Sequence, residues 1–311
     1  MSYKVSNERP EMRSEATEQQ VPHLPDYAST LIGAIGRVDL RVRDIERSLG
    51  FYSSVAGLQI MQRDESGVSL GAGTDVFLHL SSEGVDAPAL RRSTGLFHTA
   101  IRYPSAADLG DALVRLAETG IPVGAGDHGV SEALYVDDPD GNGVELYRDR
   151  PLDEWPTPPS GQKVIGMTGP VDLDRLIELS RGTDALGQPA PLTTDIGHIH
   201  LKVSDMARTF EFYSKILGLD VMGEMRDQAG FFSSYGYHHN IGTNTWESRG
   251  AGPAPSNHAG LSRVVFEVDG QEEISALAER LSGAEGYHES IESGITVKDP
   301  DGIELVFVVA R

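Results

Sequence analysis

Residues 36–61 read GRVDLRVRDIERSLGFYSSVAGLQIM, and residues 197–222 read GHIHLKVSDMARTFEFYSKILGLDVM. The two stretches align at a constant offset of 161 residues, as from Val42 to Val203 and from Tyr52 to Tyr213. The motif Asp-Pro-Asp-Gly begins at Asp138 and returns at the same offset. Self-similarity over a fixed period is the signature of a repeated structural unit. The chain therefore holds two copies of one unit.

Each copy divides again into two similar parts. After Gly36, the alternation of apolar and polar residues predicts a strand with one buried face. Asp44 then caps a predicted helix that ends at Gly57, and short strands follow at about 59–64, 67–70 and 75–80. The order of strand, helix and three strands recurs along the chain. It predicts an α+β fold of four βαβββ modules, which we number one to four, at about 35–88, 95–150, 195–250 and 258–311.

Two segments fall outside these modules. Residues 1–34 begin with a polar stretch, which we expect to be an N-terminal arm. Residues 151–194 form a connector rich in proline and glycine, within which VDLDRLIELS (171–180) predicts a short helix. The expected organisation is a first unit at 35–150 and a second at 195–311, with the connector between them.

The composition excludes several classes of function. The net charge of −21, from 26 basic and 47 acidic residues, argues against binding to nucleic acids or anionic membranes. The absence of cysteine excludes disulfides, thiolate metal ligands and cysteine nucleophiles. No apolar run approaches the roughly 18 residues of a membrane span. The N-terminus lacks the apolar core of a signal peptide, so we expect a cytoplasmic protein.

The four modules, with D-x6-FY-x4-GL in the first and third, resemble the vicinal oxygen chelate family. This family includes glyoxalase I, fosfomycin and bleomycin resistance proteins, methylmalonyl-CoA epimerase and extradiol dioxygenases. The resemblance covers about residues 35–311 and implies two tandem vicinal oxygen chelate domains with curved mixed sheets. The fold alone does not choose among these activities.

Module two carries a more specific pattern. It runs from Gly126-Asp127-His128 through Leu134-Tyr135 and the Asp-Pro-Asp-Gly motif to Glu145, and it resembles the signature of extradiol ring-cleaving dioxygenases. The chain is also similar to the two-domain catechol 2,3-dioxygenase branch, although Asn240 stands where that branch usually has a histidine. The resemblance implies an enzyme of aromatic catabolism that opens a small aromatic diol with O2. Its cofactor would be Fe(II), or Mn(II) in its place.

The resemblance also implies where the metal ligands lie. The family's ligand positions fall on Arg37 in module one, His98 and Glu145 in module two, His198 in module three, and Arg263 and Glu304 in module four. Arginine is cationic at any ordinary pH and is not a ligand, so neither sequential pair of modules completes a site. Pairing modules two and three instead gives His98, Glu145 and His198, a two-histidine, one-carboxylate set. Modules one and four would then hold an ion pair of both arginines with Glu304. Sequential pairing, with His79 in place of His198, stays open.

The family also uses an acid–base histidine beside the substrate. The candidates are His128 and one of His238 and His239. We expect the latter two on a strand, where neighbouring residues face opposite sides, and we prefer His239. Tyr135 is expected to hydrogen-bond a substrate oxygen through its phenol. His200 shares the strand face of His198 and is predicted to be structural.

Two other functions compete with a dioxygenase. One is a metal-free protein of this family that binds or sequesters a ligand. The other is an isomerase of the glyoxalase or epimerase type, which would want carboxylates where the odd-numbered modules offer histidine or asparagine, so it is disfavoured. A homo-oligomer is left open.

Overall fold

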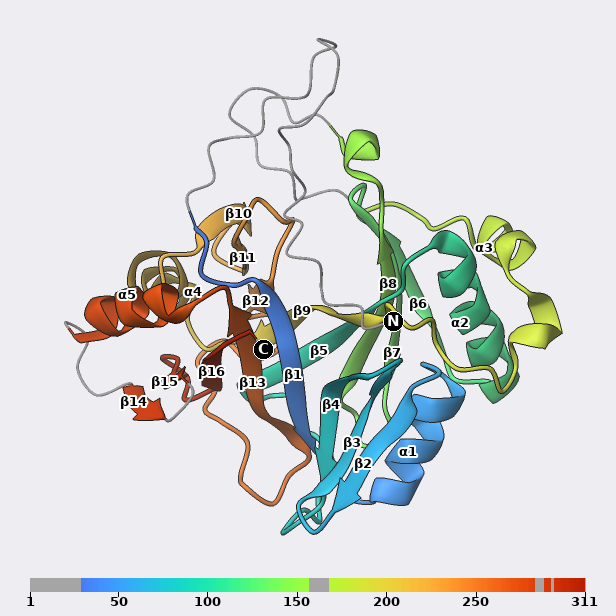
Figure 1. Cartoon of the computed structure of the whole chain (residues 1–311), viewed down its shortest axis with the longest axis horizontal. Coiled ribbons are helices and arrows are strands. Elements are labelled where there is room, and N and C mark those ends of the chain that lie inside the picture. Colours follow the sequence, from blue (N-terminus) through green and yellow to red (C-terminus); the bar gives the residue numbers. More distant parts are fainter. Residues whose placement is uncertain (1–28, 157–167, 283–287, 292–293, 311) are drawn as a thin grey trace.

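The computed structural model describes residues 29–156, 168–282, 288–291 and 294–310. Figure 1 shows a strongly curved sheet with helices on its outside. Every module has the predicted order of elements. Module one comprises β1 (Ala34–Arg41), α1 (Ile45–Ser54), β2 (Gln59–Asp64), β3 (Gly67–Ala72) and β4 (Asp75–Ser81). Module two comprises β5 (Gly95–Arg102), α2 (Ala106–Thr119), β6 (Gly124–Asp127), β7 (Ser131–Asp137) and β8 (Gly143–Asp149).

The second copy repeats this order with one local difference. Module three comprises β9 (Asp195–Lys202), α4 (Met206–Phe210), η3 (Glu211–Ile216), β10 (Asp220–Met225), β11 (Ala229–Ser233) and β12 (Ile241–Asn244). Here the predicted helix is α-helical only as far as Phe210, and η3 continues it as a π-helical turn. Module four comprises β13 (Gly260–Val268), α5 (Gln271–Ser282), β14 (His288–Ile291), β15 (Gly294–Lys298) and β16 (Glu304–Val309).

The strand pairings cross between the two copies. Within each module the first strand pairs in parallel with the last, as β1 with β4 and β5 with β8. On their other sides, β1 pairs antiparallel with β13, and β5 pairs antiparallel with β9. Module one therefore packs with module four, and module two packs with module three. The two halves join at the bridge between Ile35 and Ile196.

The pair of modules one and four brings the two arginines together, but around Asp39 and not around Glu304 as predicted. Asp39 accepts from Arg37 Nε at 2.6 Å and from Arg263 Nε at 2.7 Å. Glu304 lies 4.0 Å from Arg263. The two arginine side chains are 36% and 42% exposed, so the cluster borders solvent and is not buried.

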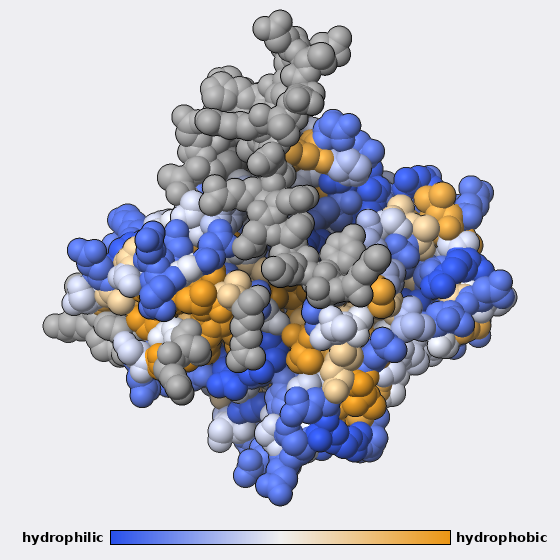
Figure 2. All heavy atoms as spheres, viewed as in Figure 1, coloured by the Kyte–Doolittle hydropathy of each residue, from blue (hydrophilic) through white to orange (hydrophobic). Residues whose placement is uncertain are grey.

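The connector contains the predicted helix as α3 (Leu173–Leu179), flanked by η1 (Leu152–Glu154) and η2 (Gly182–Ala185). Most of the expected N-terminal arm lies outside the described residues, but Leu31 and Ile32 are buried in the core. Figure 2 shows hydrophilic residues along most of the outer edge of one face, with apolar residues nearer its middle. In the described part of the chain, no helix is long and apolar enough to cross a membrane.

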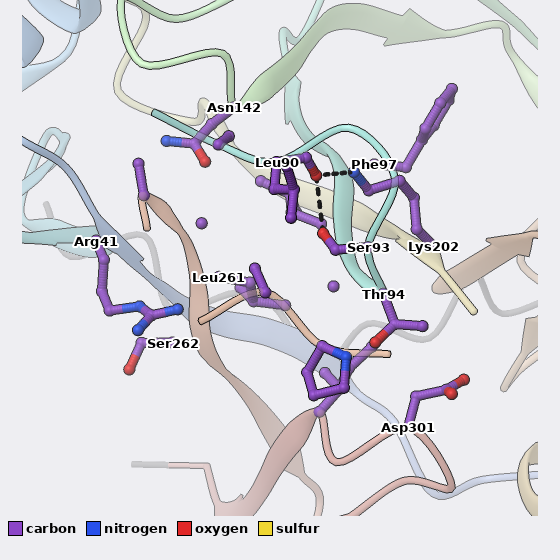
Figure 3. A pocket seen from close by; sticks show the side chains of 18 of the residues that line it. Arg41, Leu90, Ser93, Thr94, Phe97, Asn142, Lys202, Leu261, Ser262 and Asp301 are labelled. Carbon is purple, nitrogen blue, oxygen red and sulfur yellow. Dashed lines mark hydrogen bonds between the residues drawn. The ribbon is translucent and has the colours of Figure 1, made fainter. Parts of the chain in front are cut away.

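Among the cavities of the described residues, two are lined by the first strands of more than one module. The larger, of about 740 Å³, lies where one end of each of β1, β5, β9 and β13 meets the others (Figure 3). Two repeat-related cations stabilise loops beside it, since Lys202 Nζ donates to the carbonyls of Leu90 and Arg91, and Arg41 donates to the carbonyl of Ser256. The smaller cavity, of about 430 Å³, lies within the half that modules two and three form. It contains most of the residues that the sequence singled out.

Candidate metal centre and active site

A row of register partners brings three of the residues that line the smaller cavity together. Tyr135 on β7 lies opposite Glu145 on β8, Glu145 opposite Ala100 on β5, and Ala100 opposite His198 on β9. Side chains of register partners project from the same face of a sheet. Ala100 is fully buried, and its side chain is a single methyl group. Glu145 and His198 therefore meet across it, with 3.0 Å between Oε2 and Nε2.

His98 completes the group from the neighbouring row. It lies on the same face of β5 as Ala100, and its Nε2 is 2.8 Å from the same Oε2 of Glu145. One candidate ligand atom from each of His98, Glu145 and His198 lies within 4.8 Å of the others, and all three side chains are buried. No hydrogen bond is made by His98 Nε2 or by His198 Nδ1. Two imidazoles and one carboxylate are the donor set of non-haem Fe(II) oxygenases, so these residues fit such a metal.

The protonation states suit a cation at this point. Burial lowers the pKa of His198 to about 4, so its imidazole is neutral and keeps the lone pair that a metal needs. Burial alone would raise the pKa of Glu145, but His198 and His98 hold it well below its usual range. The carboxylate is therefore ionised at neutral pH.

Tyr135 and His128 face each other at the wall of this cavity. The phenol oxygen of Tyr135 lies 2.7 Å from His128 Nε2, and its ring centre is 5.6 Å from that of His98. Burial, followed by the charge of Glu145, raises the pKa of Tyr135 well above its usual range. Tyr135 therefore keeps its proton and can donate a hydrogen bond to a ligand in the cavity.

The expectation that His238 and His239 lie on a strand is wrong. They lie in the turn between β11 and β12, where Tyr235 (φ 55°) and Gly236 (φ 70°) take left-handed conformations that end the strand. The ring of His239 lines the cavity, with its centre 4.1 Å from that of His198. His238 is fully buried behind it, with Nε2 2.8 Å from a carboxylate oxygen of Asp149. Of this pair, His239 faces the cavity.

Most of the aromatic wall of the cavity was not predicted from the sequence. Phe97, Phe231 and Trp246 line it, together with His200. Phe97 lies at a register shift in β5, which brings it and His98 to neighbouring positions on the cavity, and its ring also borders the larger cavity. His200 lies on the cavity as well, its Nε2 has no hydrogen-bond partner, and burial lowers its pKa well below the usual range. The spacing His198-x-His200 on a strand was the available signal.

His79 lies elsewhere. It is on β4 in module one, and its Nδ1 is 3.1 Å from the hydroxyl of Ser69. It does not line the smaller cavity. In the residues that the structure describes, His98, Glu145 and His198 are the one group of three histidine or carboxylate side chains with ligand atoms this close.

Comparisons with known proteins agree with this architecture. The family model of the Glyoxalase/Bleomycin resistance protein/Dioxygenase superfamily matches residues 34–146 and 195–307. Catechol-2,3-dioxygenase of Bacillus subtilis (strain 168) is 41% identical over 279 residues, which is 88% of this chain and 97% of that relative. Biphenyl-2,3-diol 1,2-dioxygenase 3 of Rhodococcus globerulus is 43% identical over 67 residues, 21% of this chain and 33% of that relative. The crystal structure of glyoxalase I from Zea mays is similar in fold, with a TM-score of 0.54 at 17% identity over 89% of this chain and 92% of that one.

Proposed function

Since the chain belongs to the Glyoxalase/Bleomycin resistance protein/Dioxygenase superfamily, we propose that it is an extradiol dioxygenase of aromatic catabolism. It would open the ring of a small aromatic diol with O2. The similarity to a catechol-2,3-dioxygenase along most of the chain supports this branch of the superfamily. The observation that carries the proposal is the convergence of His98 and His198 on one oxygen of Glu145, beside Tyr135.

In this proposal His98, Glu145 and His198 hold the metal, which is Fe(II), or Mn(II) in its place. The bound metal supplies the redox chemistry that allows O2 to react with the aromatic diol. Two imidazoles and one carboxylate bound to a metal carry a single negative charge, so the three ligands would cancel one of the two positive charges. Such a site favours the binding of an anionic diol oxygen.

Other side chains would position the substrate and move its protons. Tyr135 would donate its phenol hydrogen to a substrate oxygen, and His239 would accept a proton from a substrate hydroxyl, with His128 as the second candidate for acid–base work. Phe97, Phe231 and Trp246 would pack against the ring and exclude water. We also propose residues 35–150 and 195–311 as the two sequence units, and the cytoplasm as the place of action.

Anaerobic loading with Fe(II), followed by a panel of catechols and O2, tests the function. We expect consumption of O2 and a product that has gained both oxygen atoms and lost its aromatic ring, as seen by mass and absorbance. Glu145→Gln is the control, because it removes the one anionic ligand while keeping the size of the side chain. Iron-loaded protein that gives no ring-opened product from any catechol would contradict the proposal.

A further inference from the structure

The face of β8 that carries Glu145 continues past the candidate metal centre to two further residues. Glu145, Tyr147 and Asp149 alternate along this strand and therefore point to the same side. Glu145 contacts His198, and the ring centre of Tyr147 lies 4.8 Å from that of His198. Asp149 lies farther along, and one of its oxygens is 2.8 Å from Nε2 of His238. The proposed function gives Asp149 and His238 no role.

Asp149 acts as a hydrogen-bond acceptor only. Besides His238, it accepts from the hydroxyl of Tyr237 at 2.9 Å and from Arg102 at 3.1 Å. Burial alone would raise the pKa of Asp149, but His238 first, and then Arg102 and Tyr237, lower it to about 2. An ionised carboxylate has no proton to donate, so Nε2 of His238 must be the donor in their hydrogen bond.

The donor role of His238 Nε2 determines which nitrogen of His239 carries its proton. A neutral imidazole carries a proton on only one nitrogen, so when Nε2 of His238 donates, its Nδ1 accepts. The atom that faces this Nδ1, at 2.8 Å, is Nδ1 of His239. His239 must then carry its proton on Nδ1. Its Nε2 keeps a lone pair, on a ring that lines the cavity.

We propose that Asp149 and His238 are positioning residues that fix the tautomer of His239, so that Nε2 of His239 is the proton acceptor in the cavity. The use of that acceptor rests on the proposed function, whereas the tautomer itself does not. The opposite direction of the hydrogen bond between His238 and His239 would need a doubly protonated His238. That ring would donate to both neighbours and leave the proton of His239 on Nε2. The two arrangements assign opposite roles, base and acid, to the same atom.

Replacement of His238 separates these arrangements. In His238→Gln the amide nitrogen can donate to Asp149 while the amide oxygen accepts from His239. Both hydrogen bonds therefore keep their direction, although the amide does not titrate. His238→Leu removes both hydrogen bonds. We expect kcat for ring opening to fall on the order of tenfold to a hundredfold in the Leu variant, with KM within about threefold, and to stay within about tenfold of the parent in the Gln variant. Tyr237→Phe is the matched control, because it deletes another hydrogen bond to Asp149 and should leave kcat near that of the parent.

The tautomer can be measured without turnover. Long-range ¹⁵N–¹H NMR of the full chain loaded with Zn(II), a d¹⁰ ion, identifies which nitrogen of each histidine carries the proton. We expect the Nδ1–H form of His239 in the parent and in the Gln variant, and loss of this preference in the Leu variant. An Nε2–H form in the parent would overturn the proposal, as would equal losses of kcat in the Gln and Leu variants. If the parent lacks ring-opening activity, the dioxygenase function fails, and the NMR result still decides the tautomer.

Discussion

Two histidine nitrogens lie within 3.0 Å of one oxygen of Glu145, and all three side chains are buried. His198 Nε2 forms a hydrogen bond with this oxygen, whereas His98 Nε2 makes no hydrogen bond and His198 Nδ1 has no partner either. Buried polar atoms without partners cost free energy, and proteins keep few of them. A cation among the three side chains would use the lone pairs that the protein leaves unsatisfied.

Tyr135 can be tested apart from the metal. Tyr135→Phe deletes the phenol beside His128 and leaves all three candidate ligands in place. We expect metal content to stay near that of the parent and turnover to fall roughly tenfold to a hundredfold, because a hydrogen bond to a charged group is worth about 1.5–3 kcal/mol. Steady-state kinetics with parallel metal analysis makes the comparison. Parent-like turnover would remove Tyr135 from the mechanism.

Some of the site residues could be predicted from the sequence, and others could not. His98, Glu145, His198 and Tyr135 were found because the repeat and the family pattern mark their positions. His239 was preferred over His238, and it faces the cavity, but the strand expected for both is replaced by a left-handed turn at Tyr235 and Gly236. Asp149 was missed, although it follows Glu145 by four residues along β8, a spacing that places both on one face of the strand.

At the scale of elements, the small residue between Glu145 and His198 in the strand register should control metal binding. Ala100→Val adds two methyl groups between Glu145 and His198, where we expect weaker Fe(II) binding and a loss of about 1–3 kcal/mol of unfolding free energy from overpacking. Thr99→Val, one residue earlier, is the control. It faces the other side of β5, and its hydroxyl has no partner to lose. Metal titration and denaturation measure both effects, and equal losses of metal affinity in the two variants would refute this role of Ala100.

The turn between β15 and β16 should show a pH dependence of its own. Asp299 accepts from the backbone N–H groups of Asp301 and Ile303 and from the hydroxyl of Tyr213. Burial, and then Asp301, raise the pKa of Asp299 from 3.8 to about 6. The folded state therefore holds this proton more tightly than the unfolded state, and its contribution, present below pH 3.8, is lost as the pH rises through about 6.

Over this window we expect Asp299 to reduce the unfolding free energy by roughly 3 kcal/mol. Asp299→Asn should remove that loss, and denaturant unfolding at intervals of pH measures it. Asp205→Asn is the control, since Asn caps a helix as well as Asp does and this site is exposed. An unchanged fall in stability between pH 4 and 6 in Asp299→Asn would show that another group is responsible.

The elements themselves were predictable. A periodicity of two for strands and 3.6 for helices, with Asp44 and Asp205 as caps, gave all four modules. The π-helical turn after Phe210 was not predicted, because the apolar spacing of that segment matches an α-helix equally well.

For the whole molecule, the decisive question was which modules pair. Strand pairing between segments far apart in the chain leaves little trace in a single sequence, so crossed and sequential pairing both fitted the repeat. What favoured crossing was chemical: arginine at two ligand positions, Arg37 and Arg263. The structure has the crossed arrangement, with Asp39 between these two arginines and His98, Glu145 and His198 in the other half.

The crossed metal site is tested most directly by titrating the parent, His198→Ala and His79→Ala with Fe(II) under anaerobic conditions, followed by an assay of ring cleavage. We expect one iron per chain in the parent. We expect loss of both iron and ring cleavage in His198→Ala, and near-normal iron in His79→Ala, because His79 lies in the other half. Iron retained by His198→Ala and lost by His79→Ala would contradict the crossed site and would move the metal into the first sequence unit.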